Sequence, residues 1–289
     1  MNQTMKQMAQ RCLVVILSLA ATHGLAEAPV AVTRQVRYGF VVENTRGAVL
    51  EDGTLWVVAP AGKTPFQICR KLTATQDFRV QIDQDGNRIL VFSLEGLPPF
   101  ATRVISIHAE VELRDQPRER MPPSAACLAP EPLMAFDDDS FRALAPALPS
   151  GDADEQATAL FDWVRDHVAD AGYKKRPLGA LAALKNAKGD CTEYSTLFVA
   201  LCRSHDIPAR VIGGYVMDNS GVLRPSGYHE WAEYYDGSTW RLADPQQGRR
   251  AEGASRYLAL RTGVSTAGVM QGHPRFRFEG DGLRVTMSH

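Results

Sequence analysis

The sequence predicts an α+β protein, in which an antiparallel β-sandwich precedes a domain of mixed helices and strands. Short runs of β-branched and aromatic residues, broken by turn residues, fill residues 33–113. Apolar residues then recur at helical spacing between residues 152 and 206, and three strand-like runs follow between residues 210 and 243. With 289 residues, 45% of them hydrophobic and 22% charged, the chain is long enough for two domains with separate cores.

The first 26 residues are predicted to be a secretory signal peptide. Lys6 and Arg11 are their only charged residues, and an almost wholly apolar run follows from Cys12 to Ala21. This run is short for a membrane span, and the small residues before position 27 fit cleavage after Ala26. We therefore expect a periplasmic or secreted protein that has no stable membrane anchor after cleavage. The net charge of −1 gives no reason to expect a nucleic-acid partner.

Residues 27–113 are predicted to form the antiparallel sandwich domain. The Asp85-Gly86-Asn87 sequence predicts a hairpin turn between two of its strands. The domain offers no cluster of acid, base and nucleophile, and His108 within a strand is expected to be structural or solvent-facing. The five runs that predict strands are residues 36–42, 55–58, 78–82, 88–92 and 103–111.

Residues 114–150 are predicted to be a connector. Seven prolines lie in this stretch and exclude regular helix or sheet over most of it. The acidic run at residues 137–139 is expected to be a solvated helix start rather than a cation site.

Four cysteines follow the predicted signal peptide. Cys191 and Cys202 are three helical turns apart, about 16 Å, which is beyond disulfide reach. Only Cys69 and Cys127 remain as a pair that an oxidising compartment could join, and the sequence leaves that pairing open. The sequence contains no Cys-x-x-Cys pair and no Cys/His cluster with zinc spacing, so neither a metal nor another cofactor is expected.

Residues 151–289 are predicted to form the second, catalytic domain. Its first helix begins at Asp152, which forms a capping box with Glu155. A later helix begins after Asp190, a preferred N-cap, and this places Cys191 in the first turn. The free backbone N–H groups and the positive helix end there favour a thiolate and would also stabilise an oxyanion.

A histidine and an aspartate are predicted to meet on the following hairpin. Asp236-Gly237 is the turn between the strands at residues 228–235 and 239–243. Because the turn is tight, His229 near the start of one strand and Asp244 at the end of the other come into register. Together with Cys191 they are the set that thiol acyl transfer needs, namely a nucleophile, a base and a carboxylate that orients the base.

The sequence resembles the transglutaminase-like superfamily of papain-fold enzymes over about residues 155 to 250. The resemblance implies a papain-like transglutaminase core, with Cys191, His229 and Asp244 as the catalytic triad. The preceding sandwich is similar to the N-terminal domains of exported bacterial members, whereas residues 251–289 match no known pattern. The motifs are Gly-Asp-Cys-Thr-Glu-Tyr-Ser at 189–195, Ile-Pro-Ala-Arg-Val-Ile-Gly-Gly-Tyr at 207–215, His-Glu-Trp-Ala-Glu at 229–233 and Ala-Asp-Pro at 243–245.

The resemblance also implies roles for less certain residues. Family members take a second oxyanion donor from an upstream side chain, for which Tyr173 and Trp163 are the candidates here. Trp231 and Tyr215 are candidates for the wall of the substrate groove. The implied reaction is attack on a glutamine carboxamide or a peptide amide through a thioester, with an amine or water as acceptor and a protein or peptide as substrate. The alternative is a non-catalytic exported module that keeps the fold as a binding scaffold.

Overall fold

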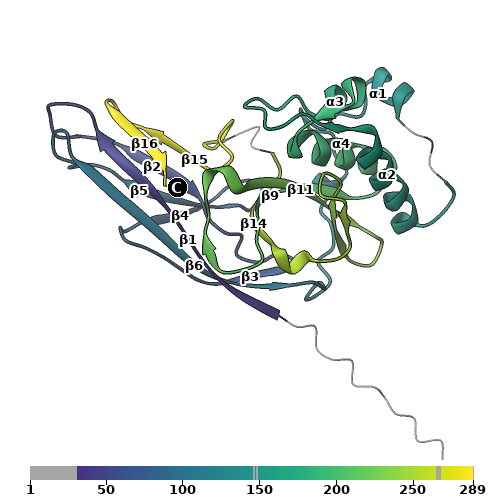
Figure 1. The fold of residues 1–289 in the computed structure, drawn as a ribbon, viewed down its shortest axis with the longest axis horizontal. Coiled ribbons are helices and arrows are strands. Elements are labelled where there is room, and N and C mark those ends of the chain that lie inside the picture. Colours follow the sequence, from purple (N-terminus) through teal and green to yellow (C-terminus); the bar gives the residue numbers. More distant parts are fainter. Residues whose placement is uncertain (1–30, 146, 148, 265–267, 289) are drawn as a thin grey trace, which may run out of the picture.

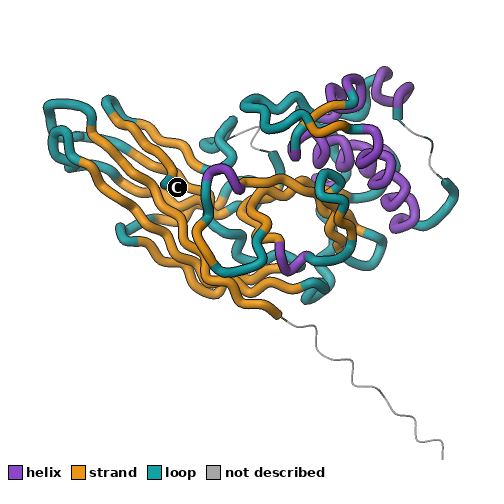
Figure 2. The backbone as a smooth tube through the Cα atoms, in the orientation of Figure 1, coloured by secondary structure: helices purple, strands orange, loops and turns teal. Residues whose placement is uncertain are grey.

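The computed structural model describes residues 31–145, 147, 149–264 and 268–288, so the predicted signal peptide lies outside the described residues. The fold is α+β, as the sequence predicts. The long strands extend to one side of the molecule, the helices gather at the other, and a strongly curved sheet lies between them (Figures 1 and 2). Within the described residues, no helix is long and apolar enough to cross a membrane.

The sandwich consists of two sheets whose inner faces share one apolar core. Alternation in the strands explains this core, because every second side chain of a strand points to the same face. The predicted turn at Asp85-Gly86-Asn87 joins the antiparallel pair β4 and β5, and His108 is exposed, as expected. The strands of one sheet are β1 (Ala31–Asn44), β6 (Thr102–Arg114) and β3 (Gln67–Ala74), and those of the other are β2 (Thr54–Val58), β5 (Arg88–Ser93) and β4 (Arg79–Ile82).

The sandwich also contains strands from the second half of the sequence. β15 (Phe276–Glu279) pairs with β2, and β16 (Leu283–Met287) pairs with β1. A short strand, β10 (Gly221–Val222), adds to β1 in parallel. Residues 276–287, which the sequence analysis assigned to the catalytic domain, therefore pair with the sandwich. Alternation within a strand does not reveal its partner, and this is why the sequence did not show the pairing.

The curved sheet has the strand order β13-β12-β11-β9-β14 and is antiparallel throughout. One face packs on the helices and the other encloses a small aromatic cluster that contains Trp231, Trp240 and Tyr257. The Asp236-Gly237 sequence joins β11 and β12, as predicted. The strands are β9 (Ala209–Val216), β11 (Tyr228–Tyr235), β12 (Trp240–Asp244), β13 (Arg249–Arg250) and β14 (Tyr257–Thr262).

Four helices cover the outer face of this sheet. The acidic run caps α1 through Asp138, and the predicted capping box of Asp152 and Glu155 begins α2. The central helix α4 packs on α2, α3 and β11, and it is buried on nearly all sides, polar residues such as Glu193 included. The helices are α1 (Asp139–Leu144), α2 (Ala153–His167), α3 (Ala180–Asn186) and α4 (Cys191–Ser204), and the short parallel strands β7 (Ala169–Asp170) and β8 (Lys188–Gly189) connect them.

The four cysteines in the described residues are free thiols. The pairing of Cys69 with Cys127, which the sequence left open, is therefore not made. Cys202 is fully buried in α4 and belongs to the helical core.

Candidate active site

Cys191 is the first residue of α4, as predicted, and a capping box fixes its position. The Asp190 side chain accepts a hydrogen bond from Thr192 N at 2.9 Å, and the Glu193 carboxylate accepts one from Asp190 N at 3.1 Å. Gly189 is required beside this cap, because a Cβ atom there would lie 2.1 Å from Glu193 Cβ. The backbone at residues 189–190 is therefore tightly packed, and this fixes the position of Cys191 at the start of the helix.

The same two carboxylates also hold the loop that precedes α3. Asp190 Oδ2 accepts from Lys174 N at 2.6 Å, and Glu193 Oε1 accepts from Leu178 N at 2.7 Å and Gly179 N at 3.3 Å. Glu193 is fully buried. The N-cap preference of Asp190 identified one of these two acids, and it carried no sign of the second set of donors, which are 14 to 16 residues away in sequence.

The environment of Cys191 opposes the thiolate. Burial, followed by the carboxylates of Glu230 and Asp190, raises the pKa of the Cys191 thiol to about 12. Hydrogen bonds from the Glu230 backbone N–H and the Thr192 side chain lower this pKa by less. The expectation that the helix start favours a thiolate is not met, because burial and the two nearby carboxylates raise the pKa of the thiol.

His229 and Asp244 meet at the open end of the β11–β12 hairpin, as the predicted register requires. His229 Nε2 lies 2.7 Å from Asp244 Oδ2. The Asp244 side chain is only 1% exposed and that of His229 is 12% exposed, so the carboxylate is enclosed while the ring reaches the surface. Gln247 N donates to Asp244 Oδ1 at 3.1 Å, which fixes the second oxygen.

Tyr257 is a further member of this site that the sequence analysis did not identify. Its hydroxyl donates to Asp244 Oδ2 at 2.9 Å. Burial and the neighbouring Asp244 carboxylate raise the pKa of Tyr257, which keeps the phenol protonated as a donor. Tyr257 begins β14, in the part of the chain that matched no known pattern, so no sequence signal pointed to it.

The histidine and the cysteine come together through β11. The Glu230 backbone N–H donates to the Cys191 sulfur, and Glu230 directly follows His229 in the strand. Since Asp244 contacts Nε2 of His229, Nδ1 is the ring nitrogen that this carboxylate leaves unoccupied. The structure thus brings Cys191, His229 and Asp244 to one end of the curved sheet.

Trp231 and Tyr215 do not line a groove. Trp231 is 1% exposed and packs between the His229 ring and Tyr257, with ring centroids 6.4 and 5.0 Å away. Tyr215 is 4% exposed and belongs to the sandwich core, where its hydroxyl lies 3.9 Å from Met287 Sδ. The curvature of the sheet encloses the face that carries Trp231, which side-chain alternation cannot reveal.

The two candidates for the second oxyanion donor lie in different surroundings. Tyr173 is 80% exposed and precedes Lys174 on the loop that Asp190 and Glu193 hold. Trp163 stacks on His167 of the same helix at 4.2 Å and packs against the helical core. Of the two, only Tyr173 is linked to the first turn of α4 by these contacts.

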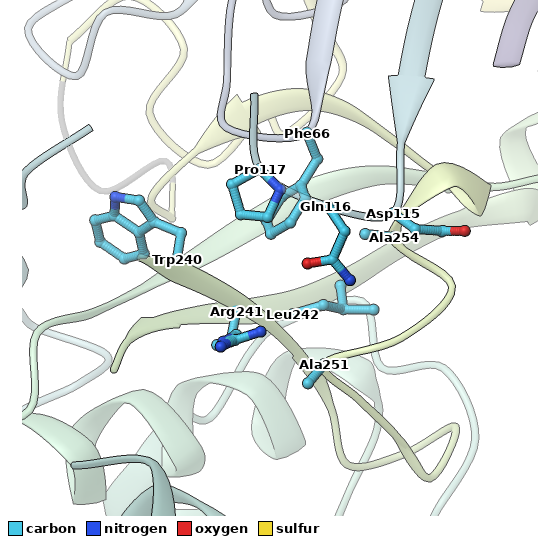
Figure 3. Close-up of a pocket in the computed structure, with 9 residues that line it drawn as sticks. All are labelled: Phe66, Asp115, Gln116, Pro117, Trp240, Arg241, Leu242, Ala251 and Ala254. Carbon is cyan, nitrogen blue, oxygen red and sulfur yellow. The ribbon is translucent and has the colours of Figure 1, made fainter. Parts of the chain in front are cut away.

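Two hollows in the surface lie away from these residues. One is found where residues 115–117 pass over Trp240 and Leu242 of β12 (Figure 3). The other, of about 510 Å³, lies between the sandwich turn at residues 82–88 and Arg210. Neither is lined by Cys191 or His229. Among the described residues, no three His, Cys, Asp or Glu side chains gather as a metal site.

A cysteine at the start of a buried helix, next to a sheet that carries an aspartate-bound histidine, defines a papain-like α+β core. Residues 142–245 match the model of the transglutaminase-like superfamily, and the chain carries a domain of that superfamily. A search of curated protein sequences found no match.

The chain is similar to several solved structures, to different degrees. A proposed cysteine protease from Cytophaga hutchinsonii is 18% identical over 90% of this chain and 92% of its own, with a TM-score of 0.57. A proposed protease from Parabacteroides distasonis is 13% identical, with 72% and 43% covered and a TM-score of 0.31. The periplasmic domain of TgpA from Pseudomonas aeruginosa is 17% identical, with 72% and 89% covered and a TM-score of 0.23. Only the first superposes well enough to support the fold, and it supports the fold alone.

Proposed function

We propose that this protein is an exported cysteine-dependent enzyme that transfers the acyl group of a glutamine carboxamide or a peptide amide through a thioester. The observation that carries the proposal is the 2.7 Å contact between His229 Nε2 and Asp244 Oδ2, at the end of the sheet that Cys191 abuts. A scaffold has no need to bury a carboxylate against a histidine ring beside a thiol. Export rests on the composition of the first 26 residues.

In the first step, His229 takes the proton of Cys191 at Nδ1. The thiol has a pKa of about 12, so it does not ionise into solvent at neutral pH and depends on this transfer. Asp244 then stabilises the imidazolium through Nε2–H. The thiolate attacks the carbonyl carbon, and the electron pair of the C=O bond moves onto oxygen. In this proposal the Cys191 backbone N–H donates to the oxyanion, since Asp190 already occupies the N–H of Thr192.

In the second step, the imidazolium returns its proton to the leaving nitrogen. The C–N bond breaks, ammonia or an amine departs, and the acyl group remains on the Cys191 sulfur as a thioester. Water or a primary amine then attacks the thioester and gives a proton to His229. The C–S bond breaks, and the departing sulfur recovers the proton from the imidazolium. Hydrolysis or transamidation therefore follows from the same intermediate.

Mass spectrometry of intact protein and peptide tests the proposal. The enzyme is incubated with a glutamine-containing peptide, with and without a primary amine. A thioester on the protein, a gain of about 1 Da on the peptide, or an amine adduct supports the proposal. Cys191→Ala should abolish each product, whereas Cys69→Ala, which removes a free thiol in the sandwich, should not. Product formation by Cys191→Ala would remove Cys191 from the mechanism.

Alkylation by iodoacetamide distinguishes the enzyme from a scaffold. If His229 forms an ion pair with the thiolate, wild-type Cys191 reacts near neutral pH, and His229→Ala reacts only in strongly alkaline solution because its thiol keeps a pKa of about 12. If wild type and His229→Ala share one alkaline profile, the thiol is not activated. The protein would then be a scaffold.

A further inference from the structure

The loop at residues 173–178 has a fixed backbone and free side chains. Its backbone N–H groups at Lys174 and Leu178 are bound by the carboxylates of Asp190 and Glu193, the capping residues on either side of Cys191. The loop ends at Gly179, which has φ +81° and lies so close to Leu133 that a Cβ atom would be 2.7 Å from its carbonyl oxygen. The path of the loop beside the nucleophile is therefore set by buried groups.

The side chains of this loop are all turned to solvent. Tyr173 is 80% and Leu178 is 58% exposed, so this short segment presents two large apolar side chains to solvent. The three residues Lys174, Lys175 and Arg176 are also exposed. None of these three forms an ion pair with any residue that the structure describes.

Basic residues elsewhere differ in whether they have an acidic partner. Arg165 pairs with Asp162 and Arg256 with Asp218, whereas the exposed Arg37 and Arg79 stand singly and have no ion pair among the described residues. Asp170, the acidic residue nearest before the loop in the sequence, accepts a hydrogen bond from Gly172 N instead. Three adjacent like charges repel one another and attract an anion to the same place.

We propose that the side chains of residues 173–178 form a substrate-docking surface for an acidic, extended peptide segment next to the amide that Cys191 attacks. The inference rests on the proposed function, since it assigns the substrate class of that same site. Lys174, Lys175 and Arg176 supply the charge, and Tyr173 and Leu178 supply apolar contact. These residues determine specificity and are not part of the proton transfers.

Proximity favours a peptide over other anions. Lys174 N is bonded to the side chain of the residue directly before Cys191, so a chain whose amide lies at the sulfur passes the loop within a few residues. An extended peptide advances about 3.3 Å per residue, and two to four residues beyond the reacting group suffice to reach three consecutive cations. A single exposed ion pair contributes little binding free energy. The preference for an acidic peptide therefore depends on several such ion pairs acting together.

Fluorescence anisotropy with the Cys191→Ala protein tests the docking surface without turnover. The probe is a labelled peptide of twelve residues with a central glutamine flanked by aspartates, and its matched partner carries asparagine at each aspartate. We expect the aspartate peptide to bind about tenfold more tightly at low salt, and the preference to shrink as salt rises. Replacing Lys174, Lys175 and Arg176 by alanine should abolish the preference. Replacing the same residues by glutamate should reverse it toward a lysine-flanked peptide.

A matched control removes three exposed basic residues from the sandwich, at Arg37, Lys71 and Arg79. This variant should keep the preference, because net charge alone does not place the anion. Equal binding of both peptides by the Cys191→Ala protein overturns the inference, even where wild type turns the peptides over. Binding to phosphatidylglycerol vesicles that depends on the loop, without peptide selectivity, overturns it in favour of a lipid surface. Selective binding without turnover in wild type keeps the docking surface and refutes the proposed function.

Discussion

On the cysteine half of the site, formed by the first turn of α4 and the loop at residues 173–178, the carboxylates of Asp190 and Glu193 accept hydrogen bonds from backbone N–H groups. On the histidine half, Asp244 accepts from the side chains of His229 and Tyr257 as well as from one backbone N–H. The acids of the first half hold the chain in place, whereas the acid of the second half holds the imidazole ring of His229.

The comparison shows that the effect of a carboxylate on Cys191 depends on the group that the carboxylate contacts. Asp190 and Glu230 lie close to Cys191, and their charges make its thiolate harder to form. Asp244 acts in the opposite direction, because it stabilises the imidazolium that forms when the thiol loses its proton. Removing these carboxylates one at a time should therefore have different effects. Loss of Asp244 should lower turnover, loss of Glu193 should lower stability, and loss of the Glu230 charge should ease formation of the thiolate.

Replacing the carboxylate of the histidine half should have the largest effect. Asp244→Asn keeps the shape but permits the wrong ring tautomer, and we expect turnover to fall about ten- to a thousandfold. Unfolding free energy should change by no more than about 1 kcal/mol, since the amide oxygen still accepts a hydrogen bond. Asp218→Asn, at an exposed ion pair with Arg256, is the control and should keep both quantities. A lower melting temperature with an unchanged rate per folded molecule would reduce Asp244 to a structural residue.

Replacing a carboxylate of the cysteine half should instead act on stability. Glu193→Ala leaves the buried N–H groups of Asp190 and Gly179 and the part-buried N–H of Leu178 without an acceptor, and we expect a loss of about 3 kcal/mol in unfolding free energy. Glu155→Ala breaks an exposed capping box of the same sequence pattern and should cost about 0.5–1 kcal/mol. Urea unfolding of both variants measures the difference. Equal losses would mean that the loop contacts of Glu193 contribute nothing.

Removing the Glu230 charge, which opposes the Cys191 thiolate, should shift the pH profile of Cys191 alkylation to lower pH. Because the Glu230 charge raises the pKa of Cys191, Glu230→Gln should lower that pKa by about one unit, and thiolate should appear at lower pH. The measurement is the rate of iodoacetamide alkylation against pH in a His229→Ala background, where no ion pair with the ring contributes. Glu230→Asp keeps the charge and should keep the profile. A profile that stays in place for Glu230→Gln would mean that burial alone sets the pKa.

Weakening the support of Asp244 should have the smallest effect. Tyr257→Phe removes one neutral donor and leaves the contact between His229 and Asp244, so we expect kcat to fall about two- to fivefold with KM unchanged. Tyr215→Phe removes a hydroxyl that faces Met287 in the sandwich core and should leave kcat as it was. If both variants lose the same activity, Tyr257 acts through packing and not through its hydroxyl.

The sequence predicted those features whose interactions span few residues. The capping box at Asp152, the N-cap at Asp190 and the turn at Asp236-Gly237 depend on neighbours within four positions, and the meeting of His229 with Asp244 follows from that turn. Tyr257 and the buried state of Trp231 depend on how strongly the sheet curves. Curvature arises from packing across strands that are far apart in sequence, so no local pattern encodes it.

The pairing of β1 with β16 has a consequence for how the chain reaches its fold. Phe40 lies opposite Met287, so β1 cannot pair with β16 until residues 283–287 have been synthesised. Contacts of such long sequence separation form slowly, because the entropy of closing the loop is lost before the contact is gained. The helices around α4 rest on local contacts and can form earlier. Until β16 arrives, part of β1 exposes unpaired backbone groups on one edge, and this interval is when the chain is most prone to join another copy of itself.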